Sequence, residues 1–187
     1  LTRDLAIRVN NKYGDKKTKG VDGKGNVFLV PDGRFLKEGA RIMALDDPTK
    51  KMSKSAENVH SRISLLDEPS KIKKSIMKAT TDSDGVVRFD RETKPGVSNL
   101  MTIYSAVTGK SFDEIEQEFA GKGYGAFKPA VGEAVVELLR PLREESERIM
   151  KDKAYLESVY KEGAAHASYL ANKTLSKVHR KIGFVAK

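Results

Sequence analysis

Apolar residues recur at three- and four-residue intervals along most of this chain, which is the spacing of one helical face. The pattern is present from the first residue, where Leu1, Leu5 and Val9 predict a helix that ends near Gly14. A helix that begins without an N-cap is unusual at a natural terminus. We therefore expect the chain to be a piece of a longer protein.

Two short apolar runs predict strands instead, at residues 27–30 and 40–45. Asp46-Asp47-Pro48 ends the second run, and residues 50–55 follow with the sequence Lys-Lys-Met-Ser-Lys-Ser, here named the lysine–serine segment. Open α/β sheets bind their ligands in loops at the carboxyl ends of strands, and the lysine–serine segment holds such a position. Between the first helix and the first strand, residues 16–26 are rich in Lys, Gly and Asp and predict a surface insertion.

From about residue 63 the spacing is almost entirely helical. A first helix should end at Ala79, after a cap at Asp67 or Ser70 and with Ile72 and Ile76 facing inward. The later helices are predicted at 97–107, 111–120, 129–151, 154–162 and 164–182. Pro95-Gly96 is predicted to break the chain, and Pro141 to kink the helix at 129–151. The apolar positions of that helix are Val131, Val135, Leu138, Leu142 and Ile149. The predicted fold class is mainly α, with an α/β remnant up to residue 57 and a helical domain over residues 58–187.

Composition narrows the function classes. The chain carries a formal net charge of +9, which favours a polyanionic partner such as nucleic acid. It contains no cysteine, which excludes disulfides and thiolate metal sites, and its three scattered histidines predict no metal site. No apolar run reaches bilayer length, so we expect a cytoplasmic protein without a membrane partner.

The lysine–serine segment is the strongest candidate for chemistry. Lysines that alternate with small hydroxyl residues can surround a polyphosphate with cations and hydrogen-bond donors. A solvated basic loop is the simpler reading of an arbitrary Lys/Ser cluster. A second candidate, Thr108-Gly109-Lys110-Ser111, resembles the tail of a P-loop, but Tyr104 occupies the position of the required glycine and a helix precedes it in place of a strand. Ser111 instead begins a capping box with Glu114.

Four cationic residues share one face of the last predicted helix and form the terminal basic stripe: Lys173, Lys177, Arg180 and Lys181. One interpretation is a solvated face whose charge suits a helix C-terminus. The other is a row of contacts to nucleic-acid phosphates. The sequence supports the two interpretations about equally.

Several motifs together resemble the bacterial tryptophanyl-tRNA synthetases. Lys51–Ser55 is similar to the second signature of class I aminoacyl-tRNA synthetases. The further matching stretches are Leu1–Ala6, Gly39–Met43, Asp47–Lys50, Ala79–Ser83, Pro95–Leu100, Ile103–Ser105, Gly121–Gly125 and Ile182–Phe184. The resemblance covers almost the whole chain.

The resemblance implies a C-terminal fragment of a tryptophan–tRNA ligase. Residues 1–57 would be the end of a Rossmann-type catalytic domain, and residues 58–187 a helical anticodon-binding domain. It implies that Lys51 and Lys54 act on the departing pyrophosphate, with Ser53 and Ser55 in support, and that Ile42 and Met52 contribute backbone contacts to the adenine pocket. The implied partners are ATP with Mg²⁺ on its phosphates, L-tryptophan and tRNA, in a full-length homodimer. The family's other signature and most of the tryptophan pocket have no counterpart in this chain, so the fragment alone should be inactive.

One departure and two rival readings accompany the resemblance. Ala56 follows the signature where relatives usually carry Asp or another polar residue, which bears on how the loop is tethered. The rival readings are a tyrosine-type or other class I synthetase, and a non-catalytic basic helical module that binds RNA and carries the signature as a vestige.

Overall fold

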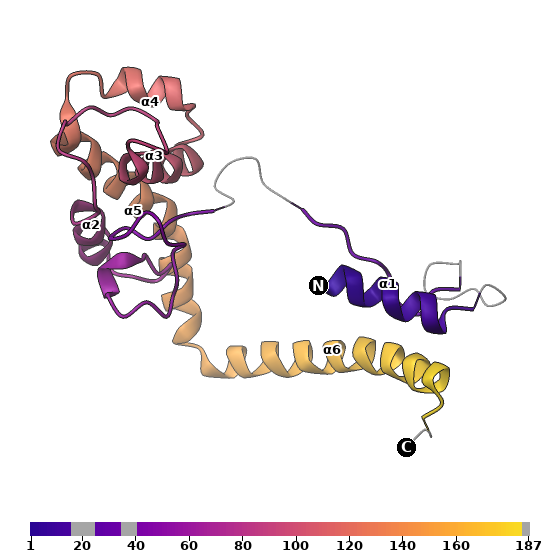
Figure 1. Ribbon diagram of the computed structural model, residues 1–187. Coiled ribbons are helices and arrows are strands. Elements are labelled where there is room, and N and C mark those ends of the chain that lie inside the picture. The colour runs from indigo at the N-terminus through magenta and orange to yellow at the C-terminus, as the bar shows by residue number, and fades with distance from the viewer. Residues whose placement is uncertain (16–24, 35–40, 185–187) are drawn as a thin grey trace. The chain divides into compact units, whose positions relative to one another are not determined.

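The computed structural model describes residues 1–15, 25–34 and 41–184. It divides into two compact units, Leu1–Arg34 with Asp152–Lys187, and Phe35–Lys151. The described residues are mainly helical and include no β-strand (Figure 1). None of their helices is both long and apolar enough to cross a bilayer. The predicted insertion at residues 16–26 lies largely outside the described residues.

The first unit begins with α1, Thr2–Tyr13, whose C-cap is Gly14 as predicted. The predicted strand at residues 27–30 is wrong, because this segment has no partner strand among the described residues. It is held by α1 instead. The Asn10 side chain accepts hydrogen bonds from the backbone N–H groups of Val27 and Phe28 at 3.0 and 2.9 Å, and donates to the Phe28 carbonyl at 2.9 Å.

The first unit also contains α6, Lys153–Ile182, in which no residue is buried. Two helices separated near Gly163 were predicted here, and that prediction is wrong. A glycine inside a helix costs only about 1 kcal/mol relative to alanine, so it does not by itself end one. The helix starts at an Asp152 cap, whose carboxylate accepts from the Tyr155 N–H at 2.9 Å.

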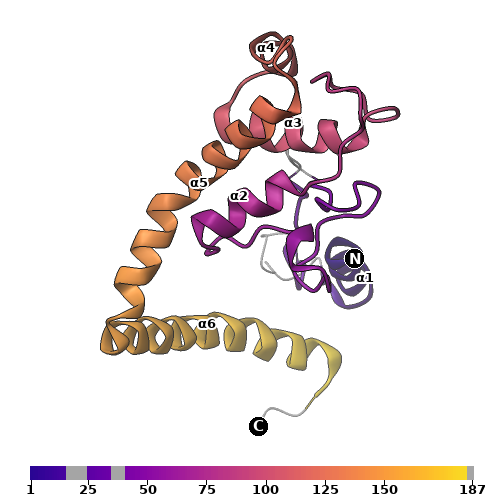
Figure 2. The ribbon, with the colours of Figure 1, turned by 90° about the vertical axis from the view of Figure 1, so that its left-hand side faces the viewer.

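The second unit is built on α5, Gly123–Met150. The helices α2, Pro69–Met77, and α3, Pro95–Thr108, both pack against it, and α4, Phe112–Glu118, packs on α3 (Figures 1 and 2). Ile72 and Ile76 are fully buried, as predicted. The buried side chains of α5 run only from Phe127 to Leu139. Two of its predicted apolar positions are about half exposed: Leu142, which lies beyond this stretch, and Leu138, which lies within it.

Two helix starts in this unit differ from the prediction. Pro95-Gly96 does not break the chain but opens α3, because proline lacks only an N–H that the first helical turn leaves unpaired anyway. The helix α5 begins six residues earlier than predicted and carries both Pro129 and Pro141 in its interior. The Ser111–Glu114 capping box is confirmed, which also confirms that Ser111 is a helix cap.

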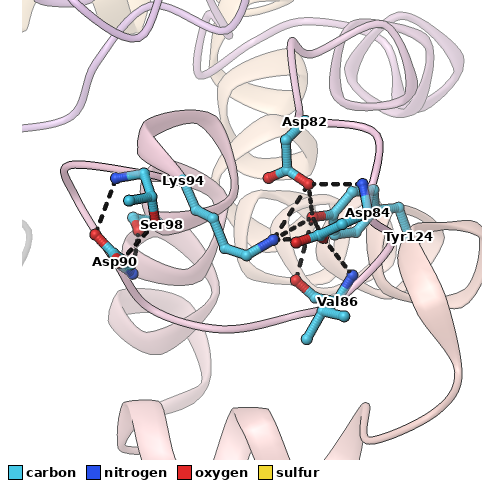
Figure 3. Close-up of polar contacts among 8 residues, drawn as sticks. Asp82, Asp84, Val86, Asp90, Lys94, Ser98 and Tyr124 are labelled. Atoms are coloured by element: carbon cyan, nitrogen blue, oxygen red, sulfur yellow. Dashed lines mark hydrogen bonds and ion pairs between the residues drawn. The ribbon is translucent and has the colours of Figure 1, made fainter.

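The loop between α2 and α3 is organised by one buried cation. The Lys94 side chain is only 4% exposed and pairs with Asp82 at 3.2 Å and with Asp84 (Figure 3). The Tyr124 hydroxyl, from the start of α5, donates to Asp82 at 2.6 Å. Burial alone would lower the pKa of Lys94, but the hydrogen bonds to Asp84, Tyr124 and Asp82 raise it above its usual range. This cluster joins the loop to the beginnings of α3 and α5.

Candidate active site

The first residues of the lysine–serine segment pair with the backbone of the extended segment that precedes them. A strand was predicted at residues 40–45, of which residues 41–45 are described, but the described residues contain only an isolated antiparallel bridge between Met43 and Lys51. Two backbone hydrogen bonds flank this bridge, from the Ala44 N–H to the Lys50 carbonyl at 2.8 Å and from the Met52 N–H to the Ile42 carbonyl at 3.0 Å. The strand prediction is wrong because a strand needs a continuous ladder, and this segment meets its partner over three residues only.

The turn before the segment is fixed by Asp47. Its carboxylate accepts from the Thr49 hydroxyl at 2.6 Å and the Thr49 N–H at 3.1 Å, and pairs with Lys50 at 2.9 Å. The bonds from Thr49, followed by the one from Lys50, lower the pKa of Asp47 to about 2. The Lys50 ammonium is thus already paired with a carboxylate of the same turn.

The base of the loop is closed by contacts between its two ends. The Leu45 N–H donates to the Ser61 carbonyl at 2.8 Å, and the Asn58 side chain donates to the Asp46 carboxylate at 2.6 Å. Asn58 also caps the short 3-10 helix Val59–Ser61 by accepting from the His60 N–H. The loop between residues 47 and 57 therefore projects from a closed base.

The departure at Ala56 is explained by a backbone tether. The Arg62 guanidinium donates to the Ala56 carbonyl at 2.7 Å, and the Ala56 N–H donates to the Ser53 carbonyl at 3.3 Å. Since both bonds use main-chain atoms, a polar side chain at position 56 is not needed to hold this end of the loop.

The structure brings the predicted phosphate-binding side chains together on this loop. Lys51 and Lys54 are exposed, and no ion pair of either lysine is found among the described residues. The Ser53 and Ser55 hydroxyls lie 3.0 Å apart. Ile42 and Met52, joined by their backbone hydrogen bond, are half-buried against the hydrophobic core. The loop thus carries two exposed lysines and two serine hydroxyls, a set of groups that suits an anion with several oxygens.

The terminal basic stripe belongs to the other compact unit. Lys173 and Arg180 are exposed on α6, and the Arg180 guanidinium also reaches back to the Ser176 carbonyl at 3.3 Å. Lys177 and Lys181 are half-buried.

Two residues that hold the segment 41–46 were not predicted for any role. Asn99 of α3 makes two hydrogen bonds to the backbone of Met43, and Thr80 makes two to the backbone of Leu45 and Asp46. A signal that could have pointed toward Asn99 is its place beside the apolar residues Val97 and Leu100 in the helix predicted at 97–107. Thr80 carried no such signal, because it lies in a turn.

The geometry can be compared with that of known proteins. A family model described as tRNA synthetases class I (W and Y) matches residues 1–140, which include the whole lysine–serine segment. The chain belongs to this family. Among curated class I synthetases it is 51% identical over 185 residues to the tryptophan–tRNA ligase of Clostridium tetani, covering 99% of this chain and 51% of that protein. It is 46% identical to the tryptophan–tRNA ligase of Oceanobacillus iheyensis, covering 98% of this chain and 52% of that protein.

Comparison with solved structures leads to the same family. The crystal structure of tryptophanyl-tRNA synthetase from Mycoplasma pneumoniae matches with a TM-score of 0.78 at 31% identity, over 98% of this chain and 54% of that one. The synthetase from Campylobacter jejuni, complexed with ADP and tryptophan, matches with a TM-score of 0.63 at 27% identity, over 97% and 52% of the two chains. The chain spans about half the length of the relatives it matches.

Proposed function

We propose that the protein containing this chain is a tryptophan–tRNA ligase, to which this chain contributes the pyrophosphate side of the active site. The observation that carries the proposal is that Lys51 and Lys54 are exposed, with no ion pair to any residue that the structure describes, on a loop whose base is closed by hydrogen bonds. The high identity to tryptophan–tRNA ligases favours tryptophan over the tyrosine-type alternative. A vestigial RNA-binding module has no comparable observation in its favour.

In the proposed reaction, the tryptophan carboxylate attacks the α-phosphorus of ATP. The bond from that phosphorus to the bridging oxygen breaks, and tryptophanyl-adenylate and pyrophosphate are formed. Negative charge moves onto the departing pyrophosphate during this step. Lys51 and Lys54 placed beside it stabilise the transition state more than the ground state, and therefore act on kcat.

The other groups of the loop take supporting roles. Ser53 and Ser55 donate hydrogen bonds to phosphate oxygens, and the backbone of Ile42 and Met52 contacts adenine. Mg²⁺ enters as part of the ATP substrate, bound to its phosphates. The adenylate then transfers its aminoacyl group to tRNA with release of AMP, and the terminal basic stripe contacts tRNA phosphates. The reaction belongs to translation in the cytoplasm, and we propose a homodimer for the full-length protein.

The test is tryptophan-dependent ATP–pyrophosphate exchange in the full-length protein. Lys51→Ala and Lys54→Ala should each lower kcat on the order of a hundredfold, with a much smaller change in KM for ATP, because the lost charge faces the leaving group.

Lys50→Ala is the matched control, since it removes a neighbouring ammonium that Asp47 already occupies. Its kcat should change only a few-fold. Equal rates in all three variants would refute the assignment of Lys51 and Lys54. Exchange that depends on tyrosine and not on tryptophan would establish the tyrosine-type alternative.

A further inference from the structure

The segment that pairs with Lys51 is held on its other edge by a side chain. Asn99 is 6% exposed, and its amide oxygen accepts from the Met43 N–H at 2.9 Å while its amide nitrogen donates to the Met43 carbonyl at 2.9 Å. Two reciprocal bonds to one residue are what a neighbouring antiparallel strand supplies. Asn99 therefore takes the place of a strand on the edge of Met43 that faces the helices.

Met43 lies between Asn99 and Lys51. On its second edge it forms the antiparallel bridge to Lys51, and the flanking bonds join Ala44 to Lys50 and Ile42 to Met52. A displacement of Met43 is thus passed directly to the residue that begins the signature. Asn99 itself belongs to α3, most of whose residues are buried in the core. The position of the loop therefore depends on a helix that is anchored in the hydrophobic core.

A second contact fixes the other end of the segment. The Thr80 N–H donates to the Leu45 carbonyl at 2.7 Å, and the Thr80 hydroxyl donates to the Asp46 carbonyl at 2.7 Å. The backbone of Thr80 lies very close to α3 at Gly96. A Cβ added to Gly96 would lie only 2.0 Å from the Thr80 carbonyl oxygen. Segment 43–46 is therefore hydrogen-bonded at one end to Asn99 of α3 and at the other end to Thr80, which lies against α3.

We propose that Asn99 is a positioning residue for adenylate formation, which sets the place of Lys51 and Lys54 through the backbone of Met43. The inference rests on the proposed function. Asn99 does not touch the reacting atoms. Its effect is geometric, because a small displacement of a catalytic group lowers the rate far more than it weakens substrate binding.

The first experiment measures amide hydrogen exchange in this chain. Asn99→Ala should raise the exchange rate of the Met43 amide at least about tenfold, because its acceptor is lost, and the Met52 amide should follow. Thr102→Val is the matched control: Thr102 is also buried in α3, but its hydroxyl bonds to the Ser98 carbonyl at 2.7 Å and not to the segment. In the control, the Met43 amide should exchange as in the wild type.

The second experiment measures pyrophosphate exchange in the full-length protein, with the active fraction counted by active-site titration. Asn99→Ala should lower kcat per active site about tenfold or more with little change in KM for ATP, and Thr102→Val should not. Asn99→Asp, which keeps the size and one acceptor but loses the donor, serves if the alanine variant does not fold. It should also lower kcat.

The outcomes separate the two proposals. Faster exchange at Met43 with an unchanged kcat per active site would overturn the positioning role, as would an equal fall in kcat in Thr102→Val. A wild-type protein without tryptophan-dependent activity would overturn the proposed function and the catalytic part of this inference together. In that case the Met43 amide still decides whether Asn99 holds the segment.

Discussion

At the scale of single residues, two asparagine side chains take the place of neighbouring strands. Asn10 bonds to the backbone of Val27 and Phe28, and Asn99 bonds to both polar groups of Met43. Both asparagines are buried members of helices. A carboxamide presents one donor and one acceptor in the same relative arrangement as a peptide group, so it can satisfy an extended backbone that has no ladder.

Gly96 is required by the close approach of two backbones. A Cβ at this position would lie 2.0 Å from the Thr80 carbonyl oxygen, which is main chain and cannot turn aside. Gly96→Ala should therefore lower the free energy of unfolding by about 1–3 kcal/mol, as overpacking does elsewhere. Urea denaturation of this chain measures the change.

The control for this substitution is Gly125→Ala. Gly125 lies near the start of α5 with nothing within 4 Å of an added Cβ, so alanine should be neutral or stabilise by up to about 1 kcal/mol. Equal stability changes at the two positions would show that the Thr80 contact does not limit Gly96.

At the scale of elements, the helices were largely predictable and the extended segments were not. Helical spacing, the Ser111 cap and the Gly14 C-cap are local signals, and the structure confirms them. Helix ends were predicted wrongly where a residue that often ends helices lies inside one, as Gly163 does in α6. The two predicted strands failed because strand formation depends on a partner strand. Residues 27 and 28 bond to the Asn10 side chain of α1, and the segment predicted at 40–45 has only one bridge, beside separate bonds to Ser61, Thr80 and Asn99.

In the candidate site too, local features were predictable from the sequence and contacts with distant residues were not. The lysines and serines of residues 51–55 follow one another in sequence, so their grouping was predictable from the sequence. The groups that hold them, Asn99 and Thr80, lie 56 and 34 residues from their partners. Such contacts depend on the packing of α3 against the segment, which no local pattern encodes.

The loop between α2 and α3 should be sensitive to acid. The hydrogen bond from Lys94, followed by the bond from the Val86 N–H, holds the pKa of Asp84 far below its ordinary 3.8. A depressed carboxylate pKa contributes stability that is fully present above the ordinary value and is lost as the pH falls through the folded value. The raised pKa of Lys94 acts only in the alkaline range, since its contribution is lost as the pH rises above 10.5.

Lys94→Met tests this reasoning. At about pH 7 it leaves Asp82 and Asp84 together without their cation, so the urea midpoint should fall clearly. At about pH 3, below the ordinary pKa of 3.8, the unfolded state takes up a proton at Asp84, so part of the stability that Lys94 gives the wild type is lost and the difference should shrink. Lys110→Met, which removes a half-exposed partner of Glu118, is the control and should have a smaller effect at either pH. A deficit for Lys94→Met that is the same at both pH values would contradict the acid sensitivity of the loop.

At the scale of the whole molecule, chemistry and charge lie in different units. The lysine–serine segment and its supports belong to the unit Phe35–Lys151, together with the residues of the main hydrophobic core. The terminal basic stripe belongs to the other unit. Residues 163–187 carry five Lys or Arg residues and no Asp or Glu, within a chain of net charge +9. The proposed contacts with a polyanionic partner and the proposed contacts with ATP therefore belong to different parts of the chain.

Salt dependence separates contacts of the stripe with tRNA phosphates from a general attraction by net charge. Replacing Lys173, Lys177 and Arg180 with Gln in the full-length protein should make the slope of log K against log salt for tRNA binding shallower by about 2–3, because each lost phosphate contact removes somewhat less than one unit. The control replaces the same number of charges away from the stripe, at Lys151, which caps α5, and at Lys153 and Lys161 in the first third of α6. Both triple variants lose three positive charges, so a general electrostatic attraction weakens equally in the two.

A slope that changes only in the first variant supports phosphate contacts at the stripe. Equal slopes in the two variants would identify the stripe as a solvated helix face, whose cations serve only to complement the C-terminal dipole of α6.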